Sequence, residues 1–213
     1  MKNFTCYKNV FIGKGAVIQP GAIIGLPSFG KKDGEVKTVI GKNAVIRSNS
    51  VIYAGCKIGK NLQTGHNVTI REDNEIGDNL SIWSNSVLYP HNKIGNSVKI
   101  HCNCFIESSV LKNNVFLGPH VVITDDLHPV CPRWKECLGG VVIEENVSVG
   151  GNVTLLPGVT IGKDSLVGAG SVVVKNIPPR TVVVGNPAKV VKRTDSLKCL
   201  KKFYKKPYEW REK

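Results

Sequence analysis

The stretch from Ile40 to Ile106 decides the fold, and it reads IGKNAVIRSNSVIYAGCKIGKNLQTGHNVTIREDNEIGDNLSIWSNSVLYPHNKIGNSVKIHCNCFI. Its isoleucines all fall on one phase of a six-residue period: Ile40, Ile46, Ile52, Ile58, Ile70, Ile76, Ile82, Ile94, Ile100 and Ile106. Thr64 and Leu88 occupy the two remaining positions of this phase, which we call the beat. A helix repeats its apolar residues every three or four positions and a strand every two, so a period of six indicates an internal repeat.

The same period continues on both sides of this stretch. It begins at Ile12, Ile18 and Ile24. It resumes in the second half of the chain at Leu111, Leu117, Ile123, Ile143, Val149, Leu155, Ile161, Val167 and Val173. The spacing from Ile106 to Leu111 is five, which we interpret as a one-residue deletion at a corner.

Each six-residue unit predicts a short strand followed by a turn. Small or β-branched residues stand two positions before most beats, as at Ala44 and Val98. Gly, Asn and Asp follow the beat, as in Gly77-Asp78-Asn79, and these residues tolerate turns and positive φ. Three units therefore predict one triangular coil with the beat residues stacked inside. The expected fold class is all-β, a parallel β-helix of hexapeptide repeats.

Two insertions and a tail interrupt the repeat. Residues 26–39 form the first insertion, and residues 124–142 form a longer one that contains a His, two Asp, an Arg, a Trp and two Cys. Long loops on a regular scaffold commonly carry function, so we predict that the second insertion is an active-site loop. Prolines after Asn176 are expected to end the coil. We expect one β-helix domain over residues 1–193 and a basic tail or short helix over residues 194–213.

Composition narrows the class of protein. The chain has 213 residues and a formal net charge of +13, with basic residues spread along it and concentrated in the tail. A basic end suits a small polyphosphate ligand as well as nucleic acid. No segment approaches the roughly 20 apolar residues of a membrane span, and residues 1–13 lack the apolar core of a signal peptide. We therefore expect a cytoplasmic protein without a membrane partner, whose seven scattered cysteines stay reduced.

Three runs carry a resemblance to a known family. They are Ile123-Thr124-Asp125-Asp126-Leu127-His128-Pro129, the segment from Val142 through Leu156-Pro157-Gly158 to Val173, and Val183-Val184-Gly185-Asn186-Pro187-Ala188-Lys189. On these runs, most of residues 40–193 resembles the hexapeptide-repeat acetyltransferases of sugars, which include galactoside and maltose acetyltransferases. The resemblance implies a left-handed β-helix, a homotrimer with clefts between its chains, and acetyl-CoA as co-substrate without a required metal.

The resemblance also implies the catalytic and cofactor-binding residues. The catalytic histidine of those enzymes precedes a proline at the start of such a loop, which implies that His128 is the catalytic base. A neutral imidazole suits this role because it titrates near neutral pH. An ordinary loop histidine is the alternative. The implied CoA-binding positions are Gly151 and Ala169 along the pantetheine arm and Lys175, Lys189 and Lys192 at the phosphates.

We expect the acceptor to bind around the loop and the neighbouring coil corners. Asp125 and Asp126 belong to the matched run, and Asn103 would approach His128 of another chain in a trimer. His66 and Arg71 are further candidates, with solvated coil corners as the alternative. The predicted reaction is acetylation of the amino group of a sugar nucleotide, and O-acetylation of a sugar hydroxyl is the alternative. His128 favours the latter, because a hydroxyl needs a base more than a neutral amine does.

Two other classes of function remain open. His128, Cys131 and Cys137 are close in sequence and are ligand types that zinc accepts, although their spacing is not a standard zinc pattern. Reduced thiols packed in the loop are the alternative. The interpretation as a nucleic-acid-binding module rests on the net charge alone, and it gives the loop of residues 124–142 no role. We therefore expect CoA and a sugar or sugar nucleotide as partners, and no nucleic acid.

Overall fold

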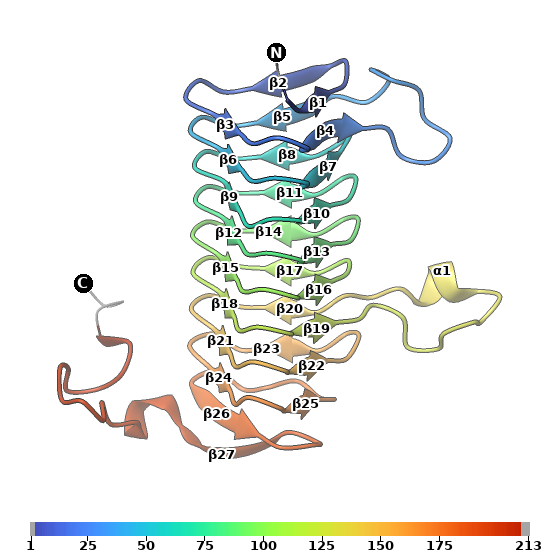
Figure 1. Ribbon diagram of the computed structural model, residues 1–213. Helices are drawn as coiled ribbons and strands as arrows, with labels where there is room; N and C mark the ends of the chain where they lie inside the picture. Colours follow the sequence, from blue (N-terminus) through green and yellow to red (C-terminus); the bar gives the residue numbers. More distant parts are fainter. Residues whose placement is uncertain (1–2, 210–213) are drawn as a thin grey trace.

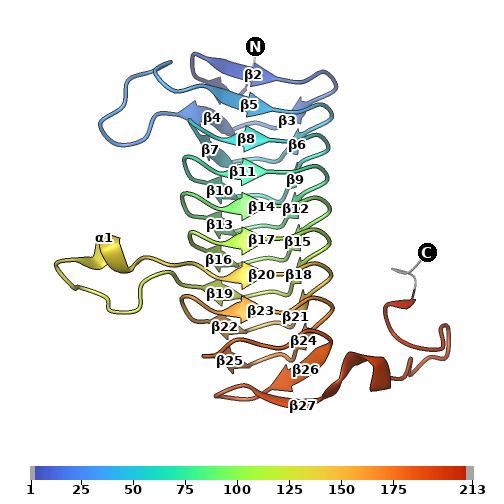
Figure 2. The same ribbon diagram turned by 180° about the vertical axis from the view of Figure 1, so that it is seen from behind.

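The computed structural model describes residues 3–209 and shows a column of short parallel strands with a triangular cross-section (Figure 1, Figure 2). From β1 to β22, each strand pairs with the third strand after it, so the chain passes through three sheets in turn, which we call A, B and C. The fold is the left-handed parallel β-helix that the resemblance implied. The turns between the sheets form three corners, which we call A–B, B–C and C–A in chain order.

Sheet A contains β1 (Thr5–Cys6), β4 (Ile23–Leu26), β7 (Val51–Tyr53), β10 (Thr69–Ile70), β13 (Val87–Leu88), β16 (Phe105–Ile106), β19 (Val122–Ile123), β22 (Thr154–Leu155) and β25 (Val172–Val173). Sheet B contains β2 (Val10–Ile12), β5 (Thr38–Ile40), β8 (Lys57–Ile58), β11 (Glu75–Ile76), β14 (Lys93–Ile94), β17 (Val110–Leu111), β20 (Val142–Ile143) and β23 (Thr160–Ile161). Sheet C contains β3 (Val17–Ile18), β6 (Val45–Ile46), β9 (Gln63–Thr64), β12 (Ser81–Ile82), β15 (Lys99–Ile100), β18 (Phe116–Leu117), β21 (Ser148–Val149), β24 (Leu166–Val167), β26 (Thr181–Val184) and β27 (Lys189–Arg193).

The beat residues form the core, as predicted. Ile70 pairs in register with Ile52 on one side and Leu88 on the other, so residues 18 apart stack along the column axis. From Ile24 to Val173 the beat residues are at most 6% exposed. Burying one such aliphatic side chain contributes about 1.5–3 kcal/mol, which makes the stack the main source of stability.

The turns explain the asparagines that follow the beat. Asn61, Asn79 and Asn85 adopt φ near 60°, a left-handed conformation that asparagine tolerates better than most residues. Their side chains also bond from coil to coil, since the Asn61 amide donates to Asn79 Oδ1 at 2.8 Å. The five-residue spacing before Leu111 is a shortened corner, as predicted, because Val110 pairs with Lys93 at a separation of 17 rather than 18.

The end of the column differs from the prediction. The prolines after Asn176 do not end the coil, since Ile177 is buried and β26 continues sheet C beside β24. β27 then turns back as an antiparallel strand on β26. A turn of 3-10 helix, η1 (Thr194–Ser196), follows, and the rest of the tail up to residue 209 forms turns and bends beside the B–C corner (Figure 1). None of the helices in this described part has the length and apolarity that crossing a membrane requires.

Candidate active site

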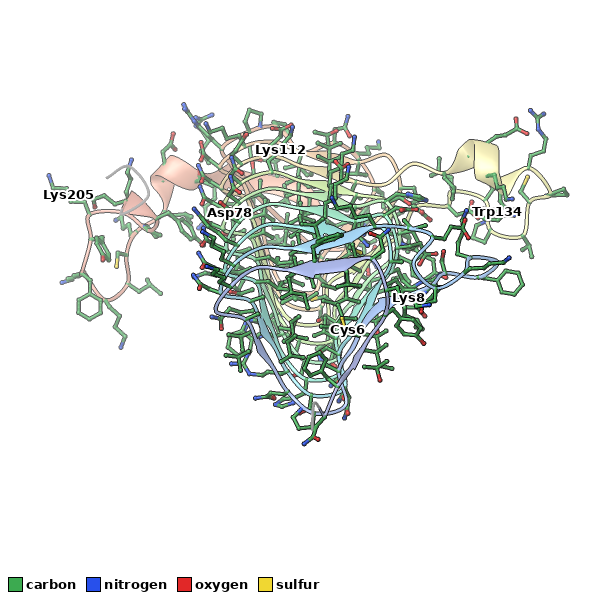
Figure 3. All side chains as sticks on the ribbon, turned by 90° about the horizontal axis from the view of Figure 1, so that it is seen from above. Cys6, Lys8, Asp78, Lys112, Trp134 and Lys205 are labelled. Atoms are coloured by element: carbon green, nitrogen blue, oxygen red, sulfur yellow. The ribbon has the colours of Figure 1, made fainter. Side chains whose placement is uncertain are left out.

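Both insertions leave the column at the A–B corner. Residues 27–37 connect β4 to β5, and residues 124–141, which we call the arm, connect β19 to β20. Figures 1 and 2 show both loops on the same side of the column, at different heights. The arm carries the short helix α1 (Trp134–Cys137). Viewed down the column, Trp134 of the arm and Lys205 of the tail project from different corners (Figure 3).

The arm is fastened to the column at its base. The side chain of Asp125 is 8% exposed and accepts a hydrogen bond of 2.6 Å from Ser108 Oγ. The Gly139 N–H donates to the Asp125 carbonyl at 2.8 Å, and Asp126 forms a bridge with Leu138. These contacts join the two ends of the arm to each other and to Ser108 of the shortened corner. The base is therefore fixed, while the tip is exposed.

A cleft lies between the base of the arm and the A–B corner. Its apolar wall consists of Tyr89, Pro90, Leu127, Pro129, Trp134, Leu138, Leu156 and Pro157. Its polar groups come from His91, Glu107, Ser108, Thr124, Asp125 and Asp126. An apolar cleft with a few convergent polar groups is the usual form of a small-molecule site. The prediction placed Asp125 and Asp126 at the acceptor, and both line this cleft.

Glu107 is the residue of this cleft that sequence reasoning missed. It follows the beat residue Ile106 and is partly buried, as are most residues at this position of the repeat. Here the arm covers it, and burial raises its pKa to about 7, with further increases from the negative charge of Asp125, from a hydrogen bond to that carboxyl and from Asp126. A carboxyl with a pKa near 7 can exchange a proton at neutral pH. The signal in the sequence was its place at the shortened corner.

A stack of aromatic and charged side chains continues from the cleft along the A–B corner. The guanidinium of Arg71 lies 5.0 Å from the ring centres of both Tyr53 and Tyr89. It also donates two hydrogen bonds of 2.7 Å to Glu72, which lowers the pKa of that carboxyl against the effect of burial. Arg71 therefore lies on the same corner as the cleft, one coil beyond Tyr89, with its charge already paired.

The arm holds His128 outside the cleft of its own chain. His128 is exposed, and its backbone N–H donates to Asp126 Oδ1 at 2.8 Å. Its neighbours Leu127 and Pro129 line the cleft, but His128 is not among the lining residues. The imidazole is thus available to a ligand or a second chain.

The C–A corner carries four further predicted residues. Asn103 and His66 are exposed in turns between sheets C and A. Gly151 and Ala169 lie on successive coils of this corner, where the Gly170 N–H donates to the Gly151 carbonyl at 2.9 Å. The structure thus groups these residues with one another and separates them from the arm. Asn103 and His128 do not meet within one chain.

The three predicted phosphate-binding lysines are exposed but lie apart. Lys189 and Lys192 are on β27 at the end of the column, with Lys189 opposite Val184 on the C–A side and Lys192 opposite Val182, nearer the B–C corner. Lys175 follows β25 and lies on the A–B side instead. Within residues 3–209, no three His, Cys, Asp or Glu side chains gather as a metal site would require.

Comparisons with known proteins agree with this architecture. The model of the bacterial transferase hexapeptide family, with six repeats, matches residues 37–72 and 140–175. The galactoside O-acetyltransferase of Lactococcus lactis is 46% identical over 85 residues, which are 38% of this chain and 41% of that protein. The UDP-N-acetylglucosamine acyltransferase of Francisella novicida has the same fold, with a TM-score of 0.62 over 92% of this chain and 70% of that chain at 16% identity. The chain spans about half the length of the curated relatives it matches.

The chain has the fold of the parallel β-helix, and its repeats are similar to those of the bacterial transferase hexapeptide family over residues 37–72 and 140–175. The predicted resemblance to the acetyltransferases of that group is confirmed.

Proposed function

We propose that the chain is an acetyltransferase that uses acetyl-CoA to acetylate the amino group of a sugar nucleotide. The observation that carries this proposal is the cleft under the arm, which combines an apolar wall with carboxyl groups on a scaffold whose repeats match a transferase model. The similarity to a galactoside O-acetyltransferase supports acyl transfer to a small sugar-like acceptor. It supports O-acetylation of a sugar hydroxyl as the second candidate.

The C–A corner suits the pantetheine arm of CoA. Gly150 and Gly151 present backbone without side chains there, and Ala169 adds only a methyl group on the next coil. A backbone N–H of this corner would stabilise the negative charge that develops on the thioester oxygen. Lys189, exposed at the end of the column on this side, would meet the phosphates, whereas Lys192 and Lys175 would need to act from other parts of the surface.

A homotrimer would complete the site. The arm leaves the A–B corner, while Asn103 and the glycines lie on the C–A corner, so one chain separates the two halves. A closed ring of three identical chains lets the arm of one chain meet the C–A corner of the next. His128, exposed on the arm, would then face Asn103 and the thioester. In the hydroxyl alternative, His128 is the base that removes the hydroxyl proton.

The direct test is release of free CoA thiol from acetyl-CoA with a panel of acceptors. The panel contains nucleotide-linked amino sugars, free amino sugars and galactosides. We expect the fastest release with a nucleotide-linked amino sugar, and faster release with galactosides would favour the second candidate. No release with any acceptor would refute both.

His128→Ala tests the base in the same assay. It should lower kcat by about 10²–10⁴-fold if His128 moves the proton. Glu136→Gln, an exposed change on the same arm, is the matched control and should keep wild-type rates. A loss of only a few-fold in His128→Ala would remove His128 as base.

A further inference from the structure

The cleft brings together the carboxyl groups of Glu107 and Asp125, of which Glu107 has no role in the proposed reaction. Glu107 comes from the shortened corner after β16, and Asp125 comes from the base of the arm. Ser108 Oγ donates a hydrogen bond of 2.6 Å to Asp125, and Glu107, the residue before Ser108, lines the same cleft as Asp125. Tyr89 and Leu156 line the same cleft, so the two carboxyl groups face a mainly apolar space.

An amine acceptor brings a proton that must leave before the reaction. Amines with pKa values near 8 are mostly ammonium ions at neutral pH, and an ammonium has no lone pair for attack. A hydroxyl arrives neutral and presents no such charge. A negative pair in an apolar cleft attracts an ammonium group and gives a neutral hydroxyl no such attraction, so it distinguishes the two acceptors by the charge of the reacting group.

We propose that Glu107, held beside Asp125 in the cleft, binds the ammonium group of the acceptor and accepts its proton, and that the acceptor is therefore a primary amine. This inference rests on the proposed acetyl transfer and specifies its acceptor. It assigns the first proton transfer to Glu107 at the corner of the column and not to His128, which is exposed on the arm.

The proton balance of the step is complete. The ammonium gives one proton to the Glu107 carboxylate and becomes a neutral amine. The nitrogen lone pair forms the C–N bond to the thioester carbon, and the C–S bond breaks to give the CoA thiolate. The second N–H proton passes to that thiolate, so the products are the amide, the free thiol and a protonated Glu107, which returns its proton to solvent.

The groups that face Glu107 favour this role. Asp125 and Asp126 approach from the arm, and His91 and Tyr89 approach from the turn after β13. The pKa of Glu107, raised to about 7 by burial and by Asp125, matches that of an efficient base at neutral pH. Arg71, one coil further on, is paired with Glu72 and does not neutralise the pair.

The test compares Glu107→Gln with wild type across pH 6 to 9.5. The acceptors are a nucleotide-linked amino sugar and the matching nucleotide sugar with a hydroxyl at the same carbon. Near pH 7 the variant should lose about tenfold in kcat/KM for the amine, because only about a tenth of an amine with a pKa near 8 is free at that pH. The deficit should fall below about twofold above the pKa of the amine, because a free amine needs no proton acceptor. A merely structural role would lower the rate equally at every pH.

Two further variants keep the test decisive. Asp125→Asn removes a negative neighbour, so the rise of kcat/KM that follows ionisation of Glu107 should move to lower pH. Glu75→Gln, an exposed change on sheet B, should match wild type at every pH. The inference is overturned if Glu107→Gln loses the same factor in kcat/KM at every pH. It is also overturned if wild type prefers the hydroxyl acceptor, a result that leaves the proposed acetyl transfer intact. Transfer to neither acceptor overturns both proposals.

Discussion

Ile82 shows how a single residue holds the column together. It is 1% exposed and lies in register between Thr64 of β9 and Ile100 of β15. Its neighbour Thr64 is a polar residue in the core, which is tolerated because its Oγ1 accepts a hydrogen bond from the Arg47 N–H at 2.8 Å. The interior therefore has little spare volume, and each beat side chain contributes packing to two adjacent coils.

Ile82→Ala should therefore be strongly destabilising. The change removes three carbons from a site that cannot collapse, and the expected loss is about 2–5 kcal/mol of the free energy of unfolding. Denaturant unfolding followed by circular dichroism measures it. Val17→Ala, a change of an exposed aliphatic residue in the same sheet, should cost less than about 0.5 kcal/mol. Equal losses in both variants would contradict the role of the beat residues as core.

Glu107 should make stability depend on pH. Its pKa is about 7 in the folded chain and is expected near the ordinary value of 4.5 in the unfolded chain. Between those values the folded state binds more protons, so raising the pH through this window lowers stability. Glu107→Gln removes this contribution. The midpoint temperature of thermal unfolding of Glu107→Gln should rise relative to that of wild type as the pH increases from 5 to 8. A difference that stays constant with pH would show that the pKa of Glu107 is not raised.

The arm is an element whose base and tip behave differently. Its base is tied to the column through Asp125 and Ser108, and its strands meet at Asp126 and Leu138. Its tip exposes Val130 and the ion pair between Arg133 and Glu136, which is worth little at the surface. An arm with this design can hold the cleft residues in place while its tip adapts to a ligand or a second chain.

Asp125→Ala should loosen the arm and leave the column folded. The change removes a charge-assisted hydrogen bond, worth about 1.5–3 kcal/mol, and leaves Ser108 without its acceptor. Trypsin should then cut faster after Arg133 and Lys135 in the arm. Glu75→Ala, which breaks only an exposed pair with Lys57, should be cut like wild type. Unchanged digestion of Asp125→Ala would mean that other contacts fasten the arm.

The sequence was sufficient for the elements that repeat and insufficient for those that depend on one contact. The beat predicted the strands from Ile40 to Val173 because a six-residue period leaves few other folds. It did not predict β27, which pairs antiparallel with β26 at the edge of sheet C. The prolines after Asn176 indicate a break in the repeat but not the strand that follows it. Glu107 was missed because the six-residue period does not show which turns lie beside an insertion such as the arm.

The site predictions divide in the same way. Asp125 and Asp126 belong to a contiguous run, and the structure places both in the cleft. Residues grouped by family resemblance were distributed over several corners, with Lys175 on one and Gly151 on another. Spacing along a β-helix determines the corner only when every insertion and deletion is counted, because a missing residue shifts all later positions.

At the scale of the whole molecule, the column has two chemically distinct corners. The A–B corner carries the arm, the carboxyl pair and the Arg71 stack, and the C–A corner carries Asn103 and the side-chain-poor turn at Gly151. A triangular column keeps these corners apart within one chain. Acetyl transfer needs the donor and the acceptor in contact, so the proposed function requires that neighbouring copies bring the corners together.

This requirement can be measured by mixing inactive subunits. His128→Ala and Asn103→Ala should each abolish most activity if both residues act at one shared site. When equal amounts are unfolded and refolded together, a site is intact where an intact arm meets an intact C–A corner, which happens at about one quarter of the interfaces in random trimers. The mixture should therefore recover about a quarter of the wild-type rate, whereas each variant refolded alone should recover none. If instead each chain carries its own complete site, mixing restores nothing, because no chain in the mixture has both residues.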